Sequence, residues 1–391
     1  MNRRLLKLAL LLSVGALALA ACGGGTPAGS GGGGGSKPVY KIAYQGPLSG
    51  DNAQLGINMD NAVKLAVEEA NKKGNLPFTL QFTNSDDVGD PAQGPSAAQK
   101  LIDDQQVVAV VGPAFSGATK ASEPLFTQAN LASVSPSATN PQLTSLGFKT
   151  FFRVVPPDDA QGKEAAAYLA KGLKAKKVYI VDDKSEYGVG LADVIQKSLG
   201  ALNVPVVREG IAPTKDYTAI ATKVASSGAD ALYYSGYFAD AALFAKALTA
   251  AGFKGVKMSD DGSNDDQFIA GAGASAAEGW QFTCPCLDAR VDPNAKAFFD
   301  AYKAKYGSDP GTYSPEAYDA ANTIISVMEK IGAQVTRDKV VQGLKSVDYK
   351  GITKEIKFQA NGEVSGTTIF VYDVKGGKRV LKGTTEKLAA G

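Results

Sequence analysis

The sequence predicts an α/β fold with two doubly wound lobes, because short β-rich runs alternate with longer amphipathic runs along most of its 391 residues. The alternation forms two series, the first beginning near Val39 and the second at Phe151. The length also exceeds what one hydrophobic core usually serves, at about 100 to 200 residues per domain. Two domains with mostly parallel sheets are therefore expected.

The first series predicts four strands separated by helices. An apolar run at 39–44 is typical of a buried strand, and the next helix places Leu55, Met59 and Val63 at helical spacing before Gly74 ends it. The same pattern recurs in strand 78–82, helix 92–104, strand 107–111, helix 118–129 and strand 132–135.

The second series repeats the alternation from Phe151 onward. Its expected elements are helix 160–173, strand 178–181, helix 188–199, strand 204–208, helix 217–227, strand 231–234, helix 239–251 and strand 256–258. Helices at 294–306 and 315–331 and a hairpin-like pair at 356–359 and 368–374 complete the chain.

The N-terminal segment predicts export and anchoring. Basic residues in the first seven positions precede an apolar run at 8–21, which has signal-peptide length and is too short to span a bilayer comfortably. Ala20, Ala21 and Cys22 resemble the lipobox of bacterial lipoproteins, so 1–21 is expected to be removed and Cys22 lipidated; a secretory signal with an incidental cysteine is the alternative. Residues 22–37, rich in glycine and serine, then form a flexible tether.

Composition excludes several classes of function. Cleavage removes three of 41 basic residues and leaves 38 against 39 acidic residues, a balance that disfavours a nucleic-acid surface. No second apolar stretch of about 18 residues follows, so membrane contact is expected through the lipid alone. The absence of histidine disfavours most hydrolases and metal sites. No catalytic residue, metal or cofactor is expected, although chemistry based on carboxylates and tyrosines stays formally open.

Two cysteines remain after the anchor, Cys284 and Cys286 on either side of Pro285. An even pair in an oxidising compartment favours a local disulfide, which requires a bend in the chain. The alternative is a redox or soft-metal role.

Two other patterns carry no function in this context. The run at 271–276 has dinucleotide-like glycines but lacks the preceding strand. The aspartates at 260–266 do not match the spacing of a calcium loop.

Polar residues follow several predicted strands at their carboxyl ends, where open α/β sheets bind ligands. Residues 112–118 open a helix whose amides and Ser116 hydroxyl suit a carboxylate. The next strand leads into Ser137 and Thr139. In the second series, Tyr187 and Tyr237 lie past their strands and the 260–262 loop is acidic. These loops are expected to meet around a ligand, although each alone could be an ordinary helix cap or core aromatic.

At these residues the chain resembles the branched-chain amino-acid binding proteins, the solute receptors of ABC importers. The resemblance covers nearly all of 38–391. It rests on five motifs, which are Gly46 to Gly50, Val111 and Gly112 with Ser116, Ser135 to Thr139 with Pro141 and Leu143, Asp183 and Lys184 with Tyr187, Gly188, Gly190 and Leu191, and Tyr233 to Tyr237.

The resemblance implies a type I periplasmic-binding-protein fold, with two Rossmann-like lobes joined by crossover hinge strands that close around the ligand. Lobe 1 is expected at 38–157 plus 285–355 and lobe 2 at 158–284 plus 356–391. The implied protein is a monomeric extracytoplasmic lipoprotein that captures a small amino acid, branched-chain or related, and presents it to the permease of an ABC importer. An amide or small aromatic ligand, or a role in sensing or adhesion, is the alternative.

The resemblance also assigns residues to the ligand. Ser116 and Thr139 would bind the α-carboxylate, with backbone contacts from Ser137, while Tyr187 and Tyr237 would come from the second lobe. Asp261 would pair with the α-ammonium. Two departures bear on the ligand's identity. Asp261 is one methylene shorter than the family's usual glutamate, and Leu55 stands where an aromatic residue is common.

Overall fold

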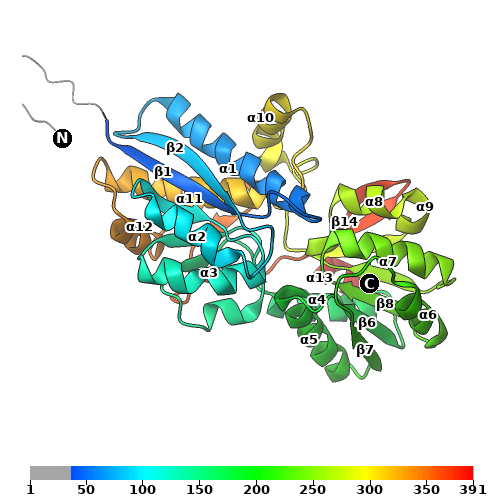
Figure 1. Ribbon diagram of the computed structural model, residues 1–391. Coiled ribbons are helices and arrows are strands. Elements are labelled where there is room, and N and C mark those ends of the chain that lie inside the picture. The colour runs from blue at the N-terminus through cyan, green and yellow to red at the C-terminus, as the bar shows by residue number, and fades with distance from the viewer. Residues whose placement is uncertain (1–36, 391) are drawn as a thin grey trace, which may run out of the picture. The chain divides into compact units, whose positions relative to one another are not determined.

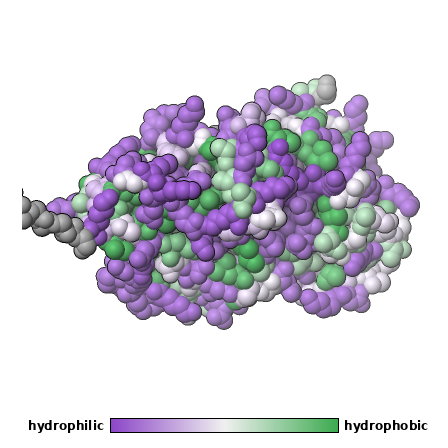
Figure 2. Space-filling model, turned by 90° about the horizontal axis from the view of Figure 1, so that it is seen from above, coloured by the Kyte–Doolittle hydropathy of each residue, from purple (hydrophilic) through white to green (hydrophobic). Residues whose placement is uncertain are grey.

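The computed structural model describes residues 37–390, so Cys22 and nearly all of the predicted tether lie outside the described residues. These residues form two α/β lobes, each built around one sheet (Figure 1). Within 37–390 no helix is both long enough and apolar enough to cross a membrane. Hydrophobic residues are scattered in small areas among hydrophilic ones on the face shown in Figure 2.

The first lobe contains a fully parallel sheet of five strands. Its order is β2 (Thr79–Asp86), β1 (Val39–Gly46), β3 (Val107–Val111), β4 (Ala132–Ser135) and β5 (Phe151–Arg153). Its helices are α1 (Ala53–Lys73), α2 (Gly94–Asp103), α3 (Ser116–Gln128), α10 (Lys296–Tyr306), α11 (Ser314–Ile331) and α12 (Arg337–Leu344).

Both faces of the first sheet are covered, because successive side chains of a strand point to opposite sides. Ile42 and Tyr44 of β1 belong to one core together with the buried residues of α1 and α11. Ala43, between them, belongs to a second core with Leu101 of α2 and Phe126 of α3. This two-sided burial explains why the central strand β3 is apolar throughout.

The second lobe contains a mixed sheet of seven strands. Its order is β14 (Lys378–Thr384), β13 (Phe370–Lys375), β10 (Trp280–Cys284), β9 (Val256–Ser259), β8 (Ala231–Ser235), β6 (Val178–Asp182) and β7 (Val206–Gly210). Its helices are α4 (Asp158–Ala167), continued by a π-helical turn, α5 (Glu186–Ala201), α6 (Thr218–Ser226), α7 (Phe238–Ala250), α8 (Asp266–Ala272), α9 (Ala274–Ala277) and α13 (Thr385–Ala390). β13 runs antiparallel to β10 and β14, whereas the other pairs are parallel.

The predicted fold class is confirmed, but the prediction for the C-terminal segment is wrong. The expected hairpin between 356–359 and 368–374 does not form. Instead β12 (Glu355–Ile356) pairs with β11 (Tyr349–Lys350), and β13 pairs with β14. β10, β14 and α12 were not predicted.

The chain passes between the two sheets in three segments, which follow β5, follow β10 and precede β13. The last of these contacts the first lobe, since Arg153 donates its backbone N–H to Gly362 O (3.1 Å) and Phe358 packs on Phe152. We therefore propose that lobe 1 extends to about residue 364, beyond the boundary at 355 expected from the sequence.

Candidate functional site

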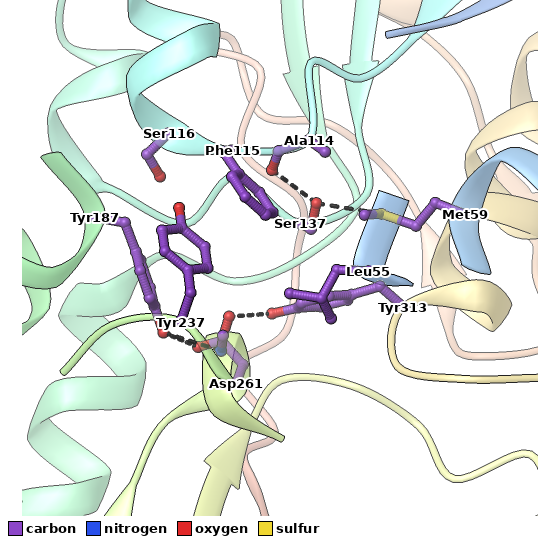
Figure 3. A pocket seen from close by; sticks show the side chains of 11 residues that line it. Leu55, Met59, Ala114, Phe115, Ser116, Ser137, Tyr187, Tyr237, Asp261 and Tyr313 are labelled. Carbon is purple, nitrogen blue, oxygen red and sulfur yellow. Dashed lines mark hydrogen bonds between the residues drawn. The ribbon is translucent and has the colours of Figure 1, made fainter. Parts of the chain in front are cut away.

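A pocket lies where loops of both lobes meet (Figure 3). Its lining joins carboxyl ends of strands in both sheets, the position at which open α/β sheets bind ligands. The lining residues are Leu55, Met59, Ala114, Phe115, Ser116, Ser137, Tyr187, Tyr237, Asp261, Gly262 and Tyr313. Residues of both lobes therefore line one site.

Ser116 is placed by the turn between β3 and α3, of which it is the first helical residue. Its side chain is buried, and its Oγ accepts a hydrogen bond from Asn140 N (3.2 Å). Because the oxygen is already an acceptor, the hydroxyl proton is free to be donated. The first amides of α3 lack partners within the helix, so this corner favours an anionic group.

The loop after β4 contributes Ser137 but not Thr139 to the lining. The Ser137 hydroxyl lies 2.8 Å from Ala114 O and 3.3 Å from Met59 Sδ, so its proton is used within the protein. Thr139 is fully buried, and its Oγ1 has no hydrogen-bond partner within residues 37–390. Of the six predicted ligand-binding residues, Thr139 alone does not line the pocket.

Asp261 lies in the short turn after β9 and is 3% exposed. Its Oδ1 accepts hydrogen bonds from Tyr187 Oη (2.6 Å) and Gln161 Nε2 (2.7 Å), and its Oδ2 accepts one from Tyr313 Oη (2.7 Å). These donors fix the carboxyl group in one orientation, and Figure 3 shows the two tyrosines among them.

Buried carboxyl groups surround Asp261. Burial raises the pKa of Asp261 in spite of its hydrogen-bond donors. Burial, followed by repulsion from Asp261, raises the pKa of Asp158 and of Asp260 well above the ordinary value for aspartate. No lysine or arginine lines the pocket. This end of the site therefore favours a cationic group, which would relieve the unfavourable burial of negative charge.

Aromatic rings close the pocket from both lobes. Phe115 of the first lobe stacks on Tyr237 of the second, with ring centroids 4.2 Å apart and planes at 22°. Tyr237 also packs against Tyr187 at 5.4 Å.

Sequence reasoning did not assign Phe115, Met59 or Tyr313 to the site. Phe115 belongs to the polar 112–118 loop that predicted the site, which was a usable signal. Tyr313, with φ of 65° immediately before α11, lies 52 residues from Asp261, and no local pattern connects them.

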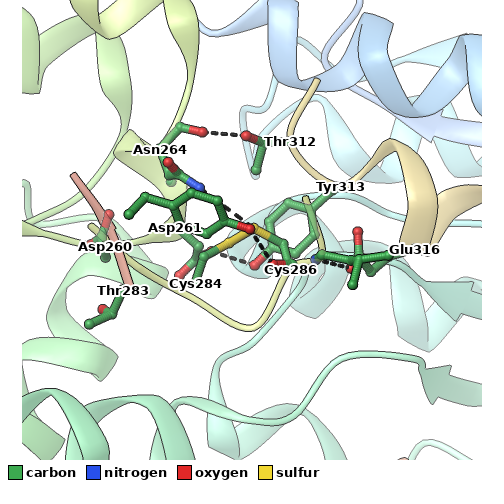
Figure 4. Close-up of a disulfide and its surroundings, with 12 residues drawn as sticks. Asp260, Asp261, Asn264, Thr283, Cys284, Cys286, Thr312, Tyr313 and Glu316 are labelled. Atoms are coloured by element: carbon green, nitrogen blue, oxygen red, sulfur yellow. Dashed lines mark hydrogen bonds between the residues drawn. A yellow bond between two sulfur atoms is a disulfide. The ribbon is translucent and has the colours of Figure 1, made fainter. Parts of the chain in front are cut away.

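Cys284 and Cys286 lie just beyond the pocket, at the end of β10 (Figure 4). Their Cα atoms are 5.1 Å apart, within the range that a disulfide requires. Both residues are buried, and Asn264 Nδ2 lies 3.6 Å from Cys286 Sγ.

The pocket offers binding groups at two ends and apolar walls between them, without an arrangement for nucleophilic chemistry among its lining residues. Within 37–390 there is also no group of three or more metal-ligating side chains placed to hold a metal ion. Two hinged lobes that enclose such a pocket define a solute-binding protein.

Comparison with known proteins identifies the family. The family model described as periplasmic binding protein matches residues 39–378. The chain belongs to this family, and within it to the branched-chain amino-acid binding proteins, which confirms the resemblance drawn from its motifs. Members of this family are solute receptors rather than enzymes.

Two curated relatives span nearly the same length as this chain. The leucine-, isoleucine-, valine-, threonine- and alanine-binding protein of Pseudomonas aeruginosa is 31% identical over 336 residues, which are 85% of this chain and 89% of the relative. A Leu/Ile/Val-binding protein of Rhizobium johnstonii is 34% identical over 345 residues, covering 87% and 92%.

Solved structures agree with the fold. The leucine-binding protein LivK of Thermotoga maritima has a TM-score of 0.82 at 27% identity and covers 88% of this chain and 98% of its own. The substrate-binding protein LivJ of Streptococcus pneumoniae, solved with isoleucine, has a TM-score of 0.81 at 28% identity with the same coverage. A solute-binding protein of R. palustris in complex with benzoate has a TM-score of 0.80 at 21% identity and shares the fold alone.

Proposed function

We propose that this protein captures a small amino acid with an aliphatic side chain, such as leucine, and presents it to the permease of an ABC importer outside the cell membrane. The observation that carries the proposal is the opposite character of the two ends of one pocket. An anion-binding helix start at Ser116 lies at one end and the buried carboxyl of Asp261 at the other. An α-amino acid carries the two matching charges.

The carboxylate end uses Ser116 and the first amides of α3. Asn140 N donates a hydrogen bond to Ser116 Oγ, so the hydroxyl proton of Ser116 remains available for the ligand. We assign Thr139 to the same end from the family resemblance; its buried hydroxyl lies beside the Asp158 carboxyl, whose pKa it lowers, and makes no well-aligned hydrogen bond within 37–390. Ser137 would contribute backbone groups, since its own hydroxyl is engaged by Ala114 O.

The ammonium end uses Asp261. Three donors already orient this carboxyl group, and a ligand ammonium would supply the positive charge that the pocket lining lacks. Charge matching must supply most of the affinity. Micromolar binding requires about −8 kcal/mol, whereas burial of a leucine-sized side chain supplies about 1.5–3 kcal/mol.

The walls between the two ends favour an aliphatic side chain. Leu55 and Met59 come from α1, and Phe115 and the ring of Tyr313 complete the apolar surface. An aromatic acid without an ammonium group would place its carboxylate at the Ser116 end and leave the buried carboxyl of Asp261 without a cationic partner, since no lysine or arginine lines the pocket. A neutral amide is the remaining alternative, because it can donate to Asp261 without a charge.

Further proposals concern the anchor and the cysteines. We propose that Cys22 carries the lipid and holds the receptor at the outer surface of the cell membrane, where two acyl chains give stable anchoring. We also propose that Cys284 and Cys286 form a disulfide. The Cα separation of 5.1 Å supports the pair, and alkylation with and without reductant, read by mass spectrometry, tests it.

The ligand is best identified by native mass spectrometry of the purified protein, followed by thermal-shift titration with leucine, isoleucine, valine, acetamide and benzoate. We expect a co-purified mass of an amino acid and a rise in melting temperature with at least one aliphatic amino acid. A rise with benzoate or acetamide alone would contradict the proposal.

A further inference from the structure

One of the contacts between the two lobes lies next to the carboxylate end of the pocket, and Asn140 makes it. Asn140 follows β4 in the first lobe and is 2% exposed. Its Nδ2 donates a hydrogen bond of 2.8 Å to the backbone O of Glu186, the first residue of α5 in the second lobe. A partly buried hydrogen bond therefore joins the lobes.

Every polar group of Asn140 is engaged. Its backbone N donates to Ser116 Oγ (3.2 Å), and its backbone O accepts from Arg153 Nη1 (2.9 Å). Its side-chain Oδ1 accepts from Gln142 N (2.8 Å). The side chain is thus held in one orientation, and the same residue contacts the serine assigned to the ligand carboxylate and the opposite lobe.

α5 accommodates Asn140 because it has a glycine at the contact. A Cβ atom added at Gly190 would lie 2.5 Å from Asn140 Nδ2, too close for any real contact. Asn140 could move away only by giving up its bond to Glu186 O. Glycine in the interior of a helix lowers helix stability relative to alanine. The space that Gly190 leaves for Asn140, which we call the notch, accounts for a glycine at this position.

A second contact reaches the same residue of α5. Lys120, one turn into α3, forms an ion pair of 2.8 Å with Glu186 Oε1. The side chains of Lys120 and Glu186 are 41% and 30% exposed, so the ion pair contributes little to the stability of the closed lobes. It forms only when the lobes are in contact and therefore reports closure. Glu186 also precedes Tyr187, which lines the pocket and bonds Asp261.

From these contacts we infer that Asn140 is a positioning residue that couples binding of the ligand carboxylate to closure of the lobes, by docking into the notch at Gly190. The inference rests on the proposed function, because it takes Ser116 as a carboxylate ligand. A ligand carboxylate bound by the Ser116 hydroxyl lies next to the residue that bonds Glu186, so the ligand and the Asn140 contact favour the same closed arrangement. Closure then stabilises the bound state.

Gly190→Ala tests the coupling, because it should change stability and affinity in opposite directions. Alanine favours the helix, so resistance to urea unfolding should rise or stay level. Affinity for leucine, measured by calorimetry, should fall by about tenfold, as expected for the loss of one interlobe hydrogen bond. Gly200→Ala is the matched control in the same helix, because an added Cβ there meets nothing within 4 Å. It should leave affinity within about twofold of the original protein.

Carbodiimide coupling of Lys120 to Glu186, read by peptide mass spectrometry, measures closure without any added ligand. We expect coupling in the original protein and in Gly200→Ala, and several-fold less in Gly190→Ala. Equal coupling and equal leucine affinity in the two glycine variants would overturn the inference. So would a loss of affinity in Gly190→Ala accompanied by an equal loss of stability. If the original protein does not bind leucine, that result contradicts the proposed function. The amount of Lys120–Glu186 cross-link in the two glycine variants still tests the inference about Asn140.

Discussion

Asp261 is the residue on which ligand selectivity depends most. Asp261→Asn keeps the shape of the side chain and an oxygen for one of the two tyrosine hydroxyls, Tyr187 or Tyr313, replaces the other oxygen with an NH2 group, and removes the charge. We expect affinity for leucine to fall by about one hundredfold, because a hydrogen bond to a charged group contributes about 1.5–3 kcal/mol. Isothermal titration calorimetry checks this, with circular dichroism as the control for folding. Unchanged affinity would show that Asp261 does not meet the ammonium.

Glu123, which does not line the pocket, makes stability depend on pH. It is fully buried between α3 and β4, where the Ser133 hydroxyl bonds its Oε1. Burial raises its pKa from 4.5 to about 8. The unfolded chain releases this proton near pH 4.5 and the folded protein only near pH 8. The stability that the neutral carboxyl contributes to the folded state is therefore complete below pH 4.5 and is lost as the pH rises to about 8. The loss is at most about 1.4 kcal/mol for each unit by which burial raises the pKa.

Glu123→Gln should remove this dependence, because an amide does not titrate. We expect the variant to resist urea better than the original protein at pH 8.5, by on the order of a few kcal/mol, and to gain nothing at pH 5. Glu329→Gln, at an exposed position of α11, is the control and should change neither curve. Parallel pH profiles for the original protein and Glu123→Gln would contradict the assignment.

At the residue scale, the sequence predicted the parts of the site that lie next to strand ends. Ser116, Ser137, Tyr187, Tyr237 and Asp261 all line the pocket, because the carboxyl ends of parallel strands converge. Tyr313 could not be found in this way, since it follows no strand and reaches Asp261 from the start of α11. Its contribution depends on how the lobes pack, which no local pattern encodes.

At the scale of elements, the sequence predicted strands that are buried along their whole length. It missed strands whose position depends on pairing with strands distant in the sequence. β3, β6 and β8 are buried at every position, and their apolar runs predicted them almost to the residue. β14 has one buried residue and lies at the edge of its sheet, so it shows no apolar pattern. β10 follows two short helices, and its place is fixed only by pairing with β9 and β13.

The segment before β13 is held to β5 by a buried ion pair. Arg153 is fully buried, and its guanidinium pairs with both carboxylate oxygens of Glu363 and donates to Ala138 O (3.0 Å). Glu363→Gln should lower the free energy of unfolding by about 3–5 kcal/mol, because it leaves a buried charge uncompensated. Glu355→Gln in the same segment breaks only an exposed pair with Lys357 and should cost at most about 1 kcal/mol. Urea denaturation compares the two, and equal losses would argue against the buried pair.

At the scale of the whole molecule, the proposed anchor keeps the receptor near its permease. Cys22→Ser removes the thiol that would carry the lipid, while the Gly/Ser-rich tether stays unchanged. We expect the protein to move from the membrane fraction to the soluble extracytoplasmic fraction, because no helix within 37–390 can hold it in a bilayer. Immunoblotting of fractionated cells checks this. Retention of the variant in the membrane fraction would point to another means of attachment.

The central claim is that two lobes hold a zwitterion by matching its charged ends. The most direct test is calorimetric titration of the purified protein with leucine and with 4-methylpentanoate, which has the same carbon skeleton and carboxylate but no ammonium group. We predict micromolar or tighter binding of leucine and at least about a hundredfold weaker binding of 4-methylpentanoate, because the analogue leaves Asp261 unmatched. Equal affinity for the two compounds, or binding of 4-methylpentanoate alone, would contradict the claim.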